Sequence, residues 1–417
     1  MPASKLHGSA NTLVHHYFLE MKKLSLLAVG KTYNITVGRR TLATLAQYFD
    51  ITCVTSQLGN ENLFGRSIFD FEVSYQEEPI SLVRLAEWPA SMKLTRFFYR
   101  GLARLLCEQS FDIILVDAEP WALYKWQAWW LARRYQPSAL FGEFTWENIE
   151  RPGLRGWILS RVYRASARLD DFTISGNQGS RMILLKYGAS KKRNLVAAQH
   201  GVDTDDFSPV LPEQKNHFRQ LFHLTPDVFL IGFCGRFMLE KGILDLIAAV
   251  REIRLDPAYQ NVHLALLGDG PLKSIITEEC PPWLHVILGQ PSSVIPQFMQ
   301  SIDLFVLPSK PLRGSGRVWE EQFGHVLVEA MACGVPTLGS DSGAIPEVIG
   351  SQEAIFPHSE VNALVQLLLK AIEDCHWRAA LGKKQRQRVE INYSHQALAR
   401  TYAGFLSAML EMKQKNR

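Results

Sequence analysis

Short, wholly apolar runs alternate with segments of helical periodicity along the first half of the chain. Such runs are typical of strands that are buried on both faces of a parallel sheet. The first occupies residues 24–29, ends at Gly30 and leads through a helical pattern at 40–48 to a β-rich run at 51–55. Further strands are predicted at 111–116, 172–175 and 194–198, and helices at 94–107, 121–135, 156–167 and 178–187. This order predicts a doubly wound sheet with helices on both faces.

The same pattern restarts after a polar stretch that ends near residue 214. Strands are predicted at 228–234, 262–267, 286–288, 304–308, 337–338 and 354–356, with a helix at 243–250. A long amphipathic helix is predicted at 394–412. We therefore expect an α/β protein with a first domain at 21–205, a second at 206–392 and a C-terminal helix at 393–417. Residues 1–20 lack a clear pattern and are expected to be a disordered extension.

Composition narrows the class of protein without naming it. Hydrophobic residues make up 47% and charged residues 21% of the 417 positions, as in ordinary globular proteins. No apolar run reaches the ~18 residues of a membrane span, and the six scattered cysteines favour a reducing compartment. The net charge is +8 over residues 1–200 and −4 over 201–417. This asymmetry suggests that the two domains have different neighbours.

One stretch, E-Q-F-G-H-V-L-V-E-A-M-A-C-G-V-P-T-L-G from Glu321 to Gly339, combines a helix with two carboxylates. Apolar residues recur at helical spacing over 326–333, and Gly334 and Pro336 end the helix. Glu329 lies in the apolar part, where a buried carboxylate would need a partner. Alternatively, Glu329 is an exposed residue of an amphipathic helix.

A second candidate is G-R-F-M-L-E-K-G at 235–242, which joins a predicted strand to a helix. Ligands in doubly wound sheets bind beyond the carboxyl ends of the strands, where Arg236 is expected. Lys241 is placed at a helix start, where the macrodipole disfavours a cation unless an anion binds there. The two cations therefore indicate a diphosphate site, or else a surface ion pair with Glu240.

Four motifs together resemble the retaining glycosyltransferases of family 4, which have the GT-B fold. They are G-R-F-M-L-E-K-G, H-G-V-D-T-D-D-F-S-P, L-L-G-D-G-P and E-Q-F-G-H-V-L-V-E-A-M-A-C-G-V-P. The resemblance spans residues 21–410 and implies two Rossmann-like domains that face a central cleft. It also implies a nucleotide-diphosphate sugar as donor, with no metal and no other cofactor. The linker motif departs from the family pattern, because His200 stands where Asn is usual.

The resemblance assigns roles to residues by position. Arg236 and Lys241 would bind the donor diphosphate, Glu329 the ribose hydroxyls and Glu321 the hydroxyls of the donor sugar. Arg236, Lys241, Glu321 and Glu119 are the predicted catalytic residues. The predicted donor-binding set is Gly30, Arg236, Lys241, Gly268, Gln290, Glu321, Phe323, Gly324, His325 and Glu329. The insert at 310–317 is expected to shape the rim of the donor or acceptor site.

The acceptor side is predicted from two segments of the first domain. D-A-E-P-W at 117–121 follows a predicted strand, and we favour Glu119 over Asp117 as the contact to an acceptor hydroxyl. A loop carboxylate without function is the alternative. Glu147 and Asn148 are further candidates, because G-E-F-T-W-E-N-I-E-R at 142–151 is similar to one branch of the family.

Basic and aromatic residues interleave at 93–104 and 155–168, as they do in helices that lie on anionic membranes. A helix with a solvated basic face is the alternative. No nucleic-acid module accompanies these segments, so we expect no nucleic-acid partner. We expect a cytoplasmic protein whose first domain contacts the inner face of the membrane peripherally.

The sequence therefore predicts a retaining, metal-independent glycosyltransferase that uses a glycan or lipid-linked acceptor in cell-surface polysaccharide or glycolipid biosynthesis. Two other hypotheses remain: a catalytically silent GT-B scaffold subunit, and a GT-B nucleotide-sugar epimerase. The presence of all four donor-site residues weighs against the scaffold. The pairing of carboxylates with cations suits transfer better than epimerisation.

Overall fold

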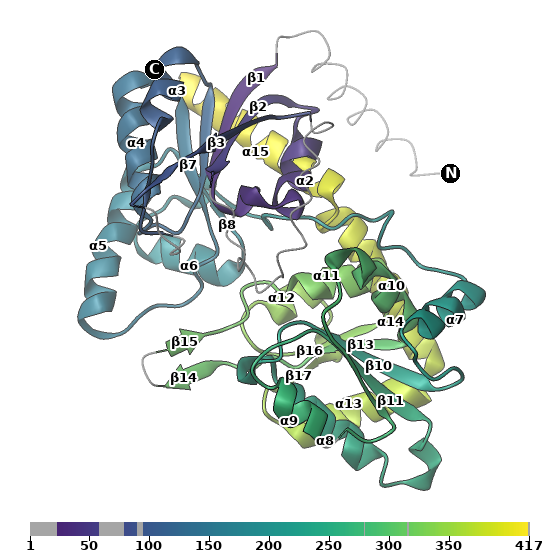
Figure 1. Ribbon diagram of the computed structural model, residues 1–417. Helices are drawn as coiled ribbons and strands as arrows, with labels where there is room; N and C mark the ends of the chain where they lie inside the picture. The colour runs from purple at the N-terminus through teal and green to yellow at the C-terminus, as the bar shows by residue number, and fades with distance from the viewer. Residues whose placement is uncertain (1–22, 58–78, 90–94, 279, 315–316, 416–417) are drawn as a thin grey trace, which may run out of the picture.

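The computed structural model describes residues 23–57, 79–89, 95–278, 280–314 and 317–415. Figure 1 shows two α/β domains, one purple to blue and the other green, with the yellow C-terminal helix running from the second back to the first. The predicted disordered extension at 1–20 lies outside the described residues.

Seven parallel strands form the sheet of the first domain, in the order β3-β2-β1-β6-β7-β8-β9. In chain order they are β1 (Leu24–Gly30), β2 (Phe49–Ser56), β3 (Ser81–Leu85), β6 (Ile113–Asp117), β7 (Leu140–Thr145), β8 (Phe172–Ser175) and β9 (Asn194–Val196). The helices are α2 (Thr36–Leu45), α3 (Leu102–Glu108), α4 (Leu123–Tyr135), α5 (Gly153–Leu169) and α6 (Gln178–Lys186).

Alternation along β1 explains why helices cover both faces of this sheet. Leu26 and Ala28 pack into a core shared with α2 and the C-terminal helix α15 (His395–Lys415). Leu27 and Val29 point to the opposite face and pack into a second core with α3 and α4. A strand buried on both faces has no room for polar alternation, which is why β1 reads as a continuous apolar run.

The second domain repeats this architecture with six parallel strands in the order β12-β11-β10-β13-β16-β17. In chain order they are β10 (Phe229–Cys234), β11 (Val262–Leu267), β12 (Leu284–Ile287), β13 (Leu304–Leu307), β16 (Thr337–Ser340) and β17 (Ile355–Phe356). The helices are α7 (Pro212–Leu221), α8 (Ile243–Ile253), α9 (Lys273–Glu278), α10 (Ile295–Ser301), α11 (His325–Ala332), α12 (Ile345–Ile349), α13 (Val361–Glu373) and α14 (Cys375–Asn392). This is the doubly wound strand order in which ligands bind at the carboxyl ends of the strands.

The chain crosses between the domains twice, and the two crossings lie side by side. Val202 of the first crossing donates its amide to the carbonyl of Tyr393 at 2.9 Å, next to the start of α15. Helix α15 then packs on the first domain, where Lys413 forms an ion pair with Asp171 at 2.8 Å. Phe405 meets Phe172 of β8 edge to face, with ring centroids 5.9 Å apart. The predicted return of the C-terminal helix to the first domain is therefore correct.

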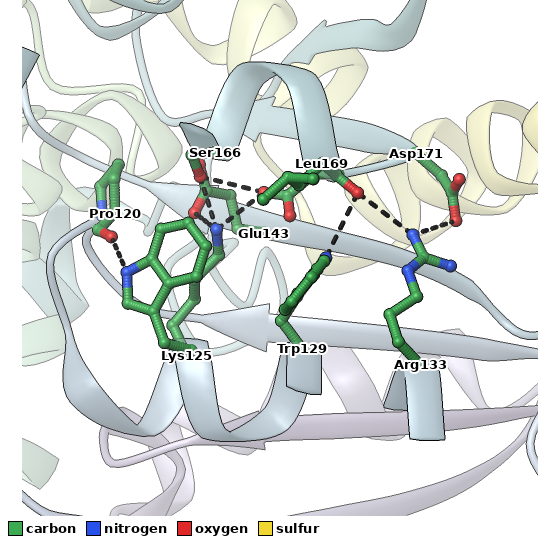
Figure 2. Close-up of polar contacts among 10 residues, drawn as sticks. Pro120, Lys125, Trp129, Arg133, Glu143, Ser166, Leu169 and Asp171 are labelled. Atoms are coloured by element: carbon green, nitrogen blue, oxygen red, sulfur yellow. Dashed lines mark hydrogen bonds and ion pairs between the residues drawn. The ribbon is translucent and has the colours of Figure 1, made fainter. Parts of the chain in front are cut away.

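A buried polar cluster ties α4, β7 and α5 together. Figure 2 shows the Lys125 ammonium directed at Glu143 and Ser166. Lys125 lies 3.3 Å from Glu143 and 3.0 Å from Asp170, and all three side chains are fully buried. Burial lowers the pKa of Lys125, but the two carboxylates more than offset this and raise it, so the ammonium stays charged. The cluster fixes β7, whose end carries part of the candidate site.

Two local predictions need correction. The expected helix at 94–107 begins only at Leu102, and Phe98–Tyr99 instead forms β5, which pairs antiparallel with β4 (Glu87–Trp88). Gly101 adopts a left-handed φ of 92° at the start of α3 and so separates the two elements. Strand β7 was not expected, because Gly142 and Glu143 interrupt its apolar run.

Candidate functional site

The predicted donor-site residues lie beyond the carboxyl ends of strands in the second sheet. Arg236 follows β10 and Gly268 follows β11, whereas Glu321 precedes α11. The first turn of α11 also carries contacts to the first domain, and Figure 1 shows α11 and α12 at the junction of the domains. The site is thus formed where a doubly wound sheet binds ligands.

Lys241 and Glu321 form the central contact of this site. The Lys241 ammonium lies 2.7 Å from Oε2 of Glu321, and the Ser309 hydroxyl donates to the same oxygen at 2.9 Å. Lys241 also lies over the Trp319 ring, 4.9 Å from its centroid. The Lys241 side chain retains 15% exposure, so a ligand can reach the charge. The alternative surface pair of Lys241 with Glu240 is not what the structure has.

Arg236 is exposed and forms no ion pair with any residue of the described part of the chain. It follows Gly235, whose carbonyl oxygen would lie only 1.9 Å from a Cβ atom at Gly268. Gly268 has a φ of 154°, so both space and conformation require glycine there. The ends of β10 and β11 therefore approach closely. Because Arg236 is exposed and has no ion-pair partner among the described residues, its guanidinium is available to an anion.

Glu329 is 6% exposed, so its interpretation as a solvent-facing residue of α11 is wrong. Its Oε1 lies 3.1 Å from Nδ1 of His325, and Nε2 of His325 lies 3.1 Å from the carbonyl oxygen of Gly201. The contact joins the linker motif to α11. The second carboxylate oxygen of Glu329, Oε2, is buried and has no hydrogen-bond partner among the described residues. A buried carboxylate oxygen of this kind can accept a hydroxyl from a ligand.

The remaining predicted donor residues are more dispersed. Gly324 is the N-cap residue of α11, and the Phe323 ring packs against Trp146 of the first domain with centroids 5.5 Å apart. Gln290 is exposed beyond β12. Gly30 belongs to the opposite domain, where a Cβ atom would lie 2.8 Å from Cβ of Asp117. Of this set, only Gly30 therefore lies on the other wall of the cleft.

On the first-domain wall, Glu119 is held by its neighbours. The Thr145 hydroxyl donates to its Oε2, and the Trp146 amide donates to its Oε1 at 3.3 Å. Burial raises the pKa of Glu119 to about 8, and the nearby Glu147 carboxylate acts in the same direction. Burial also raises the pKa of Asp117 to about 6. Of these two carboxyl groups, Glu119 therefore stays mostly protonated at pH 7, whereas Asp117 is mostly ionised there.

Glu147 and Asn148 follow the residues that hold Glu119, and Asn148 contacts the second domain. Nδ2 of Asn148 donates to the backbone carbonyl of Glu321 at 3.2 Å. Glu147 is buried and lies 3.4 Å from Arg151; burial raises the pKa of Glu147 although that guanidinium opposes the shift. Of the predicted acceptor-side residues, Asn148 therefore contacts the backbone of Glu321, the partner of Lys241.

Several contacts of the site were not predicted. Trp319 and Ser309 flank the Lys241–Glu321 pair, and Asn177 donates to the carbonyl of Gln322 at 2.8 Å across the domains. Trp319 belongs to a hairpin of β14 (Leu312–Gly314) and β15 (Arg317–Trp319), which the insert at 310–317 largely forms. The position of Trp319, two residues before Glu321 in the sequence, could have indicated that its ring lies near Lys241.

Two further features of the described residues concern metal ions and membranes. Within the described ranges, no three or more His, Cys, Asp or Glu side chains are grouped so that they could hold a metal ion. No helix formed by those residues is both long enough and apolar enough to cross a membrane.

Comparison with known proteins gives a family for the second domain. Residues 214–388 match the family described as "Glycosyl transferases group 1". A GDP-mannose-dependent monoacylated alpha-(1-6)-phosphatidylinositol monomannoside mannosyltransferase of Corynebacterium glutamicum is 27% identical over 217 residues, which are 50% of this chain and 55% of that protein. The capsular polysaccharide biosynthesis glycosyltransferase CapM of Staphylococcus aureus is 30% identical over 191 residues, 44% of this chain and 47% of that protein. The chain thus spans about half the length of the curated relatives it matches.

Solved structures extend the likeness to both domains. Anabaena Alr3699/HepE in complex with UDP superposes with a TM-score of 0.67 at 16% identity and covers 92% of this chain and 100% of that one. A glycosyltransferase from Rickettsia africae gives a TM-score of 0.70 at 16% identity, over 94% of this chain and 99% of that one. At such low identity these likenesses establish the fold, which is the predicted GT-B fold. The chain therefore has the GT-B architecture, and its residues 214–388 are similar to the group 1 glycosyl transferases.

Proposed function

We propose that this protein is a retaining, metal-independent glycosyltransferase of family 4 that transfers a sugar from a nucleotide-diphosphate sugar to a glycan or lipid-linked acceptor. The family of residues 214–388 supports the reaction class. The names of the relatives, which include a lipopolysaccharide core mannosyltransferase and a putative teichuronic acid glycosyltransferase, support a role in cell-surface polysaccharide or glycolipid synthesis.

The single observation that carries the proposal is the pairing of Lys241 with Glu321, on the same strand–helix connection as the exposed Arg236. A nucleotide-diphosphate sugar has a diphosphate and sugar hydroxyls next to each other. Two cations can bind the diphosphate, while the Glu321 carboxylate accepts hydroxyls from the sugar. The unpartnered Oε2 of Glu329 offers an acceptor for a ribose hydroxyl. These four side chains match the donor in charge and in order.

In the proposed reaction the acceptor hydroxyl attacks the anomeric carbon from the face that the diphosphate leaves. The bond from the anomeric carbon to the diphosphate oxygen breaks, the new glycosidic bond forms, and the hydroxyl proton passes to the departing phosphate. Lys241 and Arg236 stabilise the negative charge that develops on that phosphate. This route requires no metal and no strong general base.

The first-domain wall supplies the acceptor contacts in this proposal. At neutral pH a Glu119 with a pKa of about 8 is mostly protonated, so it can donate a hydrogen bond as well as accept one. Asn148 already bridges to the carbonyl of Glu321 and would help to fix the distance between acceptor and donor sugar.

We further propose a cytoplasmic protein whose first domain touches anionic membrane through α5. Three large apolar side chains on α5, those of Leu154, Trp157 and Ile158, are exposed next to the arginines of the same helix. Co-sedimentation with anionic vesicles at low salt tests this contact. Absence of the protein from the pellet would refute it.

A thermal-shift screen of nucleoside diphosphates and their sugars tests the enzyme proposal. We expect one nucleoside diphosphate to raise the melting temperature and its sugar to be hydrolysed slowly in the absence of acceptor. If no nucleoside diphosphate raises the melting temperature and no sugar is hydrolysed, the proposal is refuted and a silent scaffold is favoured. Release of a C2-epimerised sugar instead of a transferred one would indicate an epimerase.

A further inference from the structure

A pocket of about 520 Å³ opens on the first domain between the start of α5 and the end of α6. None of the residues predicted as catalytic lines it. Six of its lining residues are cationic or aromatic: Arg151, Trp157, Tyr163, Arg164, Lys186 and Tyr187.

Polar atoms around this pocket lack partners. Tyr163 is 4% exposed, and its hydroxyl makes no hydrogen bond with any described residue. Nε of Arg151 and Oδ1 of Asn148 are likewise buried without a partner in that part of the chain. Buried polar groups without partners are uncommon, because each costs ~1–3 kcal/mol. Two of these three atoms are hydrogen-bond donors, which points to a ligand rich in acceptor oxygens.

The charge of the pocket is positive. Lys186 is neutralised by Glu150 at 2.6 Å, and Arg151 faces Glu147 at 3.4 Å. Arg164 forms no ion pair with a described residue and instead lies over the Tyr187 ring, 5.6 Å from its centroid. An exposed guanidinium held over an aromatic ring is placed for an anion at little further entropic cost.

The pocket adjoins the acceptor wall of the cleft. Arg151 connects it to Glu147, and the next residue, Asn148, contacts the backbone of Glu321. The charges of Glu147 and Glu119 also act on the Tyr163 hydroxyl, because they add to the effect of burial in raising its pKa. The pocket is therefore linked through Arg151 and Glu147 to the residue that contacts Glu321.

We propose that this pocket binds a phosphate group of the acceptor, so that the substrate is a phosphorylated one. The inference rests on the proposed glycosyl transfer and adds the chemical class of its acceptor. A phosphate presents oxygens on several sides and can accept from Arg164, Arg151 and the Tyr163 hydroxyl together. Its source is either a lipid headgroup or a free phosphorylated glycan.

Calorimetric titration with octyl phosphate and with glycerol 1-phosphate tests the proposal on the full chain. The donor site is first saturated with the nucleoside diphosphate found in the thermal-shift screen, so that the probes report on the pocket alone. We expect Arg164→Gln to weaken probe binding about 10-fold or more, and Tyr163→Phe to weaken it less. Arg168→Gln, an exposed arginine of the same helix outside the pocket, is the matched control.

Preference for octyl phosphate would identify a lipid source, and equal binding of both probes a free phosphate; either supports the proposal. No binding by the wild-type protein, or equal losses in Arg164→Gln and Arg168→Gln, would overturn it. In transfer assays Arg164→Gln should raise the acceptor KM and leave the dissociation constant of the donor unchanged. A protein that binds the nucleoside diphosphate but neither phosphate probe would refute the pocket alone, whereas failure to bind any nucleoside diphosphate would refute the proposed function.

Discussion

Lys125 and Lys241 each lie beside carboxylates, but their surroundings differ. The Lys125 side chain is fully buried among Glu143, Asp170 and Ser166, and its closest carboxylate oxygen is 3.0 Å away. Lys241 has one carboxylate partner, Glu321 at 2.7 Å, and keeps 15% of its side chain exposed.

The exposure of the two ammonium groups and the number of their carboxylate partners distinguish a structural ion pair from one that a ligand can contact. All the charged partners of Lys125 come from its own domain, and no solvent reaches its ammonium. Lys241 contacts a carboxylate that can accept sugar hydroxyls, and the same connection from β10 to α8 carries the exposed Arg236. Loss of Lys125 should therefore cost stability, and loss of Lys241 should cost activity.

The largest expected effect is on stability. Replacing Lys125 with Met leaves two buried carboxylates without their cation and should lower the free energy of unfolding by ~3–5 kcal/mol. Denaturant unfolding monitored by circular dichroism measures it. The matched substitution Lys241→Met should lower stability less than Lys125→Met does, because it leaves one carboxylate rather than two without a cation and water reaches part of the site. Equal losses in the two variants would remove the distinction drawn between the lysines.

The next effect concerns Arg236, the second cation of the predicted diphosphate site. Arg236→Gln should weaken binding of the nucleotide-sugar donor by about 10- to 100-fold, since a charge-assisted hydrogen bond contributes ~1.5–3 kcal/mol. Calorimetric titration of donor measures the change. Arg251→Gln, on the exposed part of α8, serves as control and should bind donor as the wild type does. Donor affinity that is the same in both variants would place Arg236 outside the site.

A pH dependence should belong to the Lys125 cluster. Burial raises the pKa of Asp170 to about 7 from an ordinary value of 3.8. Between these values the folded state holds a proton that the unfolded state has released, so the free energy of unfolding should fall as pH rises from about 4 to about 7. We expect a fall of roughly 1–3 kcal/mol that Asp170→Asn removes. An unchanged slope in this variant would assign the titration to another group.

The smallest expected effect concerns the ring beside Lys241. Trp319→Leu removes a cation–π contact worth ~0.5–1 kcal/mol and should lower turnover about two- to fivefold. Trp130→Leu, at an exposed tryptophan of α4, should leave turnover unchanged and serves as control. Steady-state kinetics at saturating donor compares them, and a loss of more than ~100-fold for Trp319→Leu would mean that the ring contacts the reacting sugar.

Continuous apolar runs made most of both sheets predictable. Strands such as β1 and β11 are largely buried on both faces, and each carries a single polar residue, near its start, in an otherwise apolar run. Strand β7 could not be found in this way, because its Glu143 is tolerated only through Lys125 and Ser166, which come from two other helices. Because these partners are distant in the sequence, the residues of β7 alone do not show that a buried Glu143 can be accommodated.

Some residues of the candidate site could likewise be predicted from the sequence, and others could not. Sequence motifs identified Lys241, Glu321 and Glu329, because each lies in a characteristic strand–helix junction or helix start. The contacts of Trp319 and Ser309 depend on how the chain packs after β13, and so local pattern did not report them. The arginine–tyrosine pocket at α5 likewise joins residues from α5, α6 and the loop after β7.

The most direct test of the central claim is to compare turnover with donor affinity in Lys241→Ala. If Lys241 stabilises the charge on the departing phosphate, kcat should fall ~10²- to 10³-fold, far more than the dissociation constant of the donor rises. Lys241→Gln, which keeps a hydrogen bond to Glu321 but lacks the charge, should show the same fall. Turnover equal to that of the wild type in the purified, folded variants would contradict the account.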